Sequence, residues 1–139
     1  GATWSSKGLA EMKNIPFPWT KTFSAKAPQT ADDNWVADLI NNYEKDSQKD
    51  KMFADLKVAK DWSEKYKVPI FLGEFGSFTR YASEVDRCRH AATVYEILGK
   101  LKIPNAWWEW DGGFNMFKAS STEIADCMRN AIDSFNAQK

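Results

Sequence analysis

The sequence predicts an α/β fold with parallel strands, and three observations support this prediction. Apolar residues recur at helical spacing in several stretches of the chain. Two short apolar runs, residues 68–72 and 103–110, have the character of strands, and the first is nearly continuous, as in a strand buried on both faces. Helices and strands alternate in the order helix, strand, helix, strand, helix. That alternation is typical of parallel βα units rather than of hairpins.

The first part of the chain is expected to be a loop followed by two helices. Residues 1–31 contain Gly and Pro without a sustained period, which predicts a long loop. Helical spacing over residues 32–43, with aspartates at the start, predicts the first helix. The charged segment 44–51 breaks this period and predicts an exposed turn. The second helix is expected to carry on one face Met52, Phe53, Leu56, Ala59, Trp62 and Tyr66.

Two capping boxes are expected to start the later helices. Ser83 is followed three residues later by Asp86, ahead of the third helical stripe. Ser120 and Glu123 have the same spacing ahead of the last stripe, residues 124–135. Each box predicts a helix that begins directly behind its serine.

The length of the chain predicts one domain that is a piece of a larger fold. Its 139 residues, 43% of them hydrophobic, are enough to form a core. Two parallel strands do not close a sheet, and an isolated pair would leave two unpaired edges, which is costly. The chain also begins at Gly1 without a Met, so we expect an upstream segment that this sequence lacks.

Composition excludes several classes of protein. Nineteen basic and nineteen acidic residues give no net charge, and no basic run suggests a nucleic-acid partner. The apolar stretches are too short to span a membrane. His90 is the single histidine and has no ligand at metal-binding spacing, so we expect a structural role, with no metal and no cofactor. Cys88 and Cys127 are expected to be buried free thiols, although a bridge stays open if their helices are neighbours.

Glu74 is the first candidate for chemistry. It follows an apolar strand and lies between glycines in Gly73-Glu74-Phe75-Gly76. In parallel α/β folds the carboxyl ends of the strands hold the active site, and glycines permit close approach of a ligand or another chain segment. An ion pair with an arginine at the strand end would explain the carboxylate equally well on spacing alone.

The second candidate segment is rich in tryptophan. In a strand through residues 106–110, Trp108 and Trp110 would share one face, and Trp107 and Glu109 the other. A tryptophan beside a carboxylate at the mouth of a barrel would make a platform for a sugar ring. Packing between strand and helices is the alternative, and we expect it for Trp107.

These segments together resemble the family 5 glycoside hydrolases. VPIFLGEFGSF, residues 68–78, resembles the seventh strand of their catalytic barrel, and NAWWEWDGGFNMF, residues 105–117, resembles the eighth. GATW at residues 1–4 and IPFP at residues 15–18 resemble the stretch after strand six. The resemblance implies the C-terminal portion of a (β/α)8 barrel, with about strands 7 and 8 and their flanking helices. Residues 1–139 would be a C-terminal fragment of one catalytic domain, completed by an absent N-terminal part.

The resemblance also implies roles for individual residues. Glu74 matches the catalytic nucleophile of a retaining enzyme, and Trp108 matches the tryptophan that stacks on the sugar. Trp4 and Glu109 fall near the cleft as substrate contacts. Phe17 and Trp19, in the loop after strand six, could touch distal sugars or pack.

The acid/base of such an enzyme is a second glutamate that follows an Asn, and no Asn-Glu pair occurs in the sequence. Glu109 is not expected to replace it, because it would lie on the wrong strand face. The acid/base is therefore expected on the absent N-terminal part, and the isolated chain is expected to be inactive.

The function implied by the resemblance is hydrolysis of β-1,4-glucosidic bonds in cellulose or related β-glucans by double displacement. The expected partners are a β-glucan polysaccharide or oligosaccharide and the N-terminal part of the same domain, with a separate chain as one form that this part could take. Secretion is implied as well. Mannanase or mixed-linkage glucanase activity is the alternative within the family, and a non-catalytic carbohydrate-binding fragment is the alternative outside it.

Overall fold

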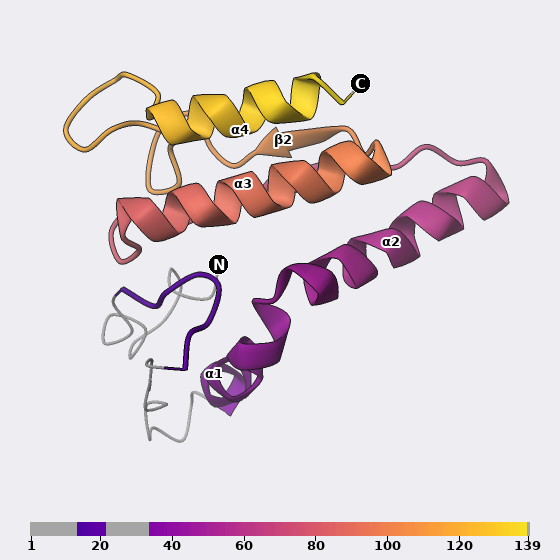
Figure 1. Ribbon diagram of the computed structural model, residues 1–139, viewed down its shortest axis with the longest axis horizontal. Helices are drawn as coiled ribbons and strands as arrows, with labels where there is room; N and C mark the ends of the chain where they lie inside the picture. Colours follow the sequence, from indigo (N-terminus) through magenta and orange to yellow (C-terminus); the bar gives the residue numbers. More distant parts are fainter. Residues whose placement is uncertain (1–13, 22–33, 139) are drawn as a thin grey trace.

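A computed structural model describes residues 14–21 and 34–138 of the chain (Figure 1). Helices and strands alternate as the sequence predicts. The elements, in chain order, are α1 Asn34–Asp46, α2 Lys49–Tyr66, β1 Leu72–Phe75, α3 Glu84–Leu101, β2 Asn105–Trp107 and α4 Asp126–Asn136.

The two strands form a parallel pair, and α3 is the crossover that connects them. Leu72 lies opposite Asn105, and Phe75 lies opposite Trp107. The Trp108 backbone N–H donates to the Phe75 carbonyl at 2.9 Å, which continues the ladder past the last residue of β2. Within the described part of the chain each strand has one partner, so each keeps one unpaired edge. The predicted parallel βα arrangement is confirmed.

The core is built around α3, which lies between α2 on one side and β2 with α4 on the other (Figure 1). One buried cluster joins α3 to α4, and the second joins α3 to the segment before β2. The first consists of Ala91, Tyr95, Ala125, Met128 and Ala131. The second consists of Val94, Ile97, Leu98, Leu101 and Ile103. Met52, Phe53 and Leu56 of α2 pack against the second cluster, while Trp62 and Tyr66 are about half exposed.

The strands differ from the sequence prediction in position. Residues 68–71 of the predicted strand 68–72 have no strand partner among the described residues, and β1 begins only at Leu72. Val68 is 43% exposed and Phe71 is 61% exposed, so this run is not buried on both faces in this chain. β2 ends at Trp107 rather than at Trp110, and a cis peptide bond joins Trp108 to Glu109. Backbone pairing, not apolar character, therefore limits both strands.

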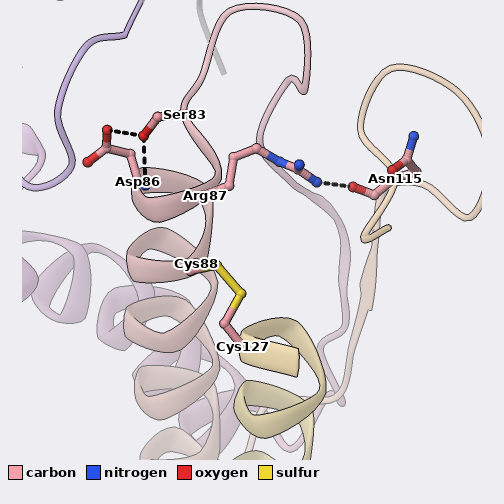
Figure 2. Close-up of a disulfide and its surroundings, with 6 residues drawn as sticks. All are labelled: Ser83, Asp86, Arg87, Cys88, Asn115 and Cys127. Carbon is pink, nitrogen blue, oxygen red and sulfur yellow. Dashed lines mark hydrogen bonds between the residues drawn. A yellow bond between two sulfur atoms is a disulfide. The ribbon is translucent and has the colours of Figure 1, made fainter. Parts of the chain in front are cut away.

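The first capping box is confirmed and the second is wrong. The N–H of Asp86 donates to the Ser83 hydroxyl at 3.1 Å, at the start of α3 (Figure 2). Helix α4 instead begins at Asp126 behind Ala125, whose backbone is extended. The segment before it turns back on itself, because Ser120 has a positive φ of 56° and the Lys118 N–H donates to the Glu123 carbonyl at 2.9 Å.

Cys88 and Cys127 form a disulfide between α3 and α4, with their Cα atoms 5.6 Å apart (Figure 2). The expectation of two free thiols is therefore wrong. Both cysteines lie on the helix faces that meet in the first core cluster, and Cys127 packs directly against that cluster. Whether two such faces meet at the same height depends on the packing of α3 on α4, which the periodicity of each helix does not specify.

Candidate active site

Glu74 lies in β1, one residue before its end, and its side chain is exposed. In the part of the chain that the structure describes, its carboxylate has no hydrogen-bond or ion-pair partner. Two arginines near the carboxyl ends of the strands have other contacts. Arg87 donates to the Asn115 carbonyl, and Arg89 contacts Asp86. The ion-pair alternative for Glu74 thus finds no partner among the described residues.

The packing of neighbouring aromatic rings defines the face on which Glu74 lies. Phe75 packs edge-on against Tyr95 at 5.3 Å and against Trp107 at 5.2 Å between ring centroids. These rings face the helices α3 and α4. Glu74 and Trp108 adjoin this pair along the chain and are both exposed, so they lie on the side of the strand pair away from the packed rings. Trp108 is 47% exposed, so the structure presents a carboxylate and an indole together on one open face.

Gly76 permits the two strand ends to approach each other. A Cβ atom on Gly76 would lie 2.2 Å from the backbone oxygen of Trp108, which no side chain can tolerate. At Gly73 the nearest group to such an atom is the Phe71 ring at 3.6 Å, an ordinary contact. The expected close approach is therefore confirmed at Gly76, where the neighbour is the chain segment that carries Trp108.

His90 supports the loop that leaves β1. Its Nδ1 lies 2.8 Å from the Ser77 hydroxyl, and its ring packs edge-on against Phe17 at 5.1 Å. Burial lowers the pKa of His90 to about 4, so the ring is neutral at pH 7. The predicted structural role agrees with these contacts.

Two aromatic residues of the upstream segment have packing contacts. Phe17 is 8% exposed, and its N–H donates to Asp86 Oδ1 at 3.0 Å, so it packs rather than facing a cleft. The Trp19 N–H donates to the Ser47 hydroxyl at 2.9 Å, which ties this segment to the end of α1. Trp4 lies outside the described residues.

Of the residues at and after the end of β2, some are packed and others are exposed. Trp107 packs as expected, and its indole N–H donates to the Phe114 carbonyl at 2.6 Å. Glu109 follows the end of β2, so strand alternation does not assign its face. Its carboxylate lies against Gly112, where a Cβ atom would be 2.6 Å from Oε1. Trp110 is 73% exposed.

Neither a metal-binding cluster nor a membrane-spanning helix is found among the described residues. No group of three or more His, Cys, Asp or Glu side chains is placed to hold a metal ion. No described helix has the length and apolar character needed to cross a membrane.

Sequence reasoning missed Arg87, which is 6% exposed although it carries a charge. It lies on the inner face of α3, beside Cys88, and lines a cavity with the loop that follows β2. The sequence does show a basic residue within an apolar helical stripe. The spacing of one helix, however, does not show which residues Arg87 faces.

No family model and no curated protein sequence matches the chain. Solved structures do match. An endoglucanase is 27% identical, with a TM-score of 0.55 over 60% of this chain and 27% of its own. Thermotoga maritima Cel5A in complex with mannotriose is 25% identical, with a TM-score of 0.53 over 60% and 27%. A family 5 xyloglucanase from Paenibacillus pabuli is 22% identical, with a TM-score of 0.56 over 91% and 33%.

The chain thus spans about a quarter to a third of the length of these neighbours. They are glucan-hydrolysing enzymes of glycoside hydrolase family 5, whose fold is the (β/α)8 barrel. The two βα units of this chain are similar in fold to a part of that barrel.

Proposed function

We propose that this chain is the C-terminal part of a retaining glycoside hydrolase that cleaves β-1,4-glucosidic bonds, with Glu74 as its nucleophile. In this proposal β1 and β2 are strands 7 and 8 of a barrel. The acid/base belongs to the N-terminal part of the same catalytic domain, which is either continuous with this chain or a separate one. Residues 1–139 form no complete site by themselves.

One observation carries the proposal. Glu74 and Trp108 lie on the same open face of a parallel strand pair, at the carboxyl ends where α/β folds hold their active sites. The carboxylate is exposed and unpaired among the described residues, and the indole beside it offers a flat apolar surface for a sugar ring. The likeness to an endoglucanase supports the same assignment.

The chemistry follows the two-carboxylate mechanism of retaining enzymes. Glu74 attacks the anomeric carbon while the acid/base protonates the departing sugar oxygen, which leaves a covalent glycosyl-enzyme. The acid/base then takes a proton from water, and the water oxygen displaces Glu74 with overall retention of configuration. Trp108 holds the reacting ring in place. Glu109 and Trp4 are proposed to contact the substrate near it.

In this proposal the N-terminal part of the domain covers the open strand edges and the exposed apolar side chains of this chain. Among the described residues each strand keeps an unpaired edge, and Phe71 beside β1 is 61% exposed. Trp62 and Tyr66 of α2 are exposed on one ridge, with ring centroids 5.4 Å apart. Unpaired strand edges and adjacent apolar side chains are the features that further strands and helices of a barrel would bury.

The central test is Glu74→Gln in the chain joined to, or mixed with, the preceding part of its domain. We expect no turnover of carboxymethylcellulose by the 139-residue chain alone and measurable turnover by the assembly. Glu74→Gln should lower kcat at least about a thousandfold, because a covalent nucleophile is lost. Binding of cellotetraose should stay within a few fold.

The matched control is Glu64→Gln on the exposed surface of α2, which should keep full activity. Hydrolysis by the isolated chain would overturn the division of the site between two parts. Unchanged turnover by Glu74→Gln would show that Glu74 is not the nucleophile. An assembly that binds cellotetraose without any turnover would favour the alternative of a carbohydrate-binding fragment.

Mannan is a second candidate substrate, because one neighbour is a complex with mannotriose. Mixed-linkage glucan is the third alternative within the family. Comparing kcat/KM of the assembly on cellotetraose, mannotetraose and barley β-glucan separates the three, and we expect the highest value on cellotetraose.

We also infer that the protein is secreted. The Cys88–Cys127 bridge supports this, because disulfides persist mainly in oxidising compartments outside the cytosol. Detection of the protein in culture medium with both cysteines oxidised is the expected result, and an intracellular protein with free thiols would contradict it.

A further inference from the structure

A polar cavity of about 790 Å³ lies apart from Glu74 and Trp108. It is bounded by the loop after β1, the first turn of α3 and the loop after β2. The first of these loops follows the strand that carries Glu74, and the second begins at Trp108. Its size is within the range of small-molecule sites in proteins, about 300–1,000 Å³.

The outer wall of the cavity is a short hairpin that carries hydroxyl groups. Phe117 pairs with Ile124 across this hairpin, and the Ser121 N–H donates to the Lys118 carbonyl at 3.1 Å. These two contacts close the turn. The tip consists of Ser120, Ser121 and Thr122, and all three line the cavity.

The inner wall contains Arg87, a buried donor with an unused hydrogen. The residue is 6% exposed, and its terminal nitrogen donates to the Asn115 carbonyl (Figure 2). Its Nε has no hydrogen-bond partner among the described residues. Because this nitrogen is itself enclosed, Arg87 gives the inner wall a positive charge rather than a donor that a ligand in the cavity can reach.

The charges and rings around the cavity select for a neutral ligand. Two cationic and two anionic side chains line it, namely Arg87, Lys118, Glu84 and Asp111. Lys118 is also paired with Glu123 and Asp126, which leaves no excess of positive charge. Phe117 adds an apolar wall. A mixture of hydroxyl, carboxylate and guanidinium groups beside an apolar surface matches a sugar ring, which has hydroxyls at its edge and C–H groups on its faces.

The apolar wall also extends out of the cavity. The Phe117 ring meets the Trp110 ring edge-on at 5.3 Å, and Trp110 is 73% exposed. This exposed indole, in contact with a residue of the cavity lining, offers a stacking surface for the next ring of the same oligosaccharide.

We propose that this cavity is an accessory sugar-binding site that takes a pyranose ring of a neutral β-glucan chain, with Trp110 stacking on the neighbouring ring. The hairpin hydroxyls and the Glu84 carboxylate bind the sugar hydroxyls. The inference rests on the proposed function for its choice of glucan. The glucan chain would then be bound at the loop that follows β2 as well as at the candidate active site.

The test is titration of the full chain with cellotetraose, followed by backbone amide chemical shifts and by calorimetry. We expect saturable shifts at the amides of residues 117–122. Because Arg87 also holds the Asn115 loop and its replacement could unfold the chain, the decisive variant is Ala119→Trp, which fills the cavity from its exposed rim. It should weaken binding at least tenfold, and Trp110→Ala should weaken it roughly two- to tenfold.

Trp62→Ala, an exposed tryptophan on α2, is the matched control and should leave the affinity unchanged. Absence of saturable shifts, or full affinity in Ala119→Trp, would overturn the inference. Saturation by galacturonate or sulfate but not by cellotetraose would also overturn it, because the cavity would then be an anion site.

Failure of this inference is separable from failure of the proposed function. Glu74→Gln should leave the shifts at residues 117–122 intact. If turnover depends on Glu74 but Ala119→Trp binds cellotetraose with unchanged affinity, only the accessory site is refuted. If Ala119→Trp abolishes the chemical shift changes but the assembly shows no turnover, only the catalytic proposal is refuted.

Discussion

The backbone oxygen of Trp108 occupies the space that a side chain at Gly76 would need, 2.2 Å from an ideal Cβ position. The loop that follows Glu74 therefore passes directly over the chain that carries the candidate sugar platform. A glycine at this point keeps the ends of β1 and β2 close. The shared face of Glu74 and Trp108 depends on that contact.

Gly76→Ala is expected to destabilise the chain by about 1–3 kcal/mol, because either the loop or the Trp108 backbone must shift. Gly73→Ala is the matched control, since its Cβ would meet the Phe71 ring at an ordinary 3.6 Å. Urea unfolding of both variants measures the difference. Equal stability of the two variants would show that the strand ends are not held as closely as the structure has them.

Reduction of the Cys88–Cys127 bridge is expected to lower the free energy of unfolding by about 2–4 kcal/mol, because the bridge closes a long loop and restricts the unfolded chain. Unfolding curves with and without dithiothreitol test this, and Cys88→Ala/Cys127→Ala should match the reduced protein. Intact mass under non-reducing conditions should be lower by two hydrogens than after reduction. Two thiols that react with a thiol reagent in the folded chain would refute the bridge.

His90 is expected to titrate near pH 4 in the folded chain, because burial disfavours its charged form. Its pKa in the unfolded chain is about 6.5. The unfolded state then binds more protons between these values, so stability is complete above pH 6.5 and falls as pH decreases toward 4, by up to about 3 kcal/mol. The single histidine gives one resolvable imidazole NMR signal for this measurement.

Two variants separate this effect from the general loss of stability in acid. Ser77→Ala removes the hydroxyl that meets His90 but leaves the ring enclosed, so the low pKa should persist. His90→Gln should flatten the dependence of stability on pH between 4 and 6.5. A folded-state midpoint near 6.5 would contradict the enclosed ring.

Phe71→Asp is expected to block assembly with the N-terminal part of the domain while leaving the stability of this chain within about 0.5 kcal/mol, because the side chain is already exposed. Val85→Asp, at a position that is 58% exposed in the first turn of α3, is the control and should assemble normally. Analytical ultracentrifugation of the mixed parts gives the affinity. Equal assembly of both variants would place the contact surface elsewhere.

Local patterns predicted much of the fold. The alternation of helices and strands, the Ser83 cap and the inward packing of Trp107 depend on residues a few positions apart, where spacing constrains geometry directly. The same reasoning placed the second cap wrongly. Ser120 has the right spacing from Glu123, but the positive φ at Ser120 and the pairing of Phe117 with Ile124 make that segment a hairpin.

The candidate site, like the fold, could be predicted from the sequence only where its residues are close together in the chain. That Glu74 follows an apolar strand between glycines could be read from the chain itself, because strand, turn and carboxylate are adjacent in it. Its placement on one face with Trp108 required the parallel register of β1 and β2, whose residues are about thirty positions apart. The Cys88–Cys127 bridge and the cavity at Arg87 required the packing of α3 against α4 and against the hairpin. Contacts between distant segments depend on how whole elements pack, and the periodicity of one element does not specify the height or rotation of its neighbour.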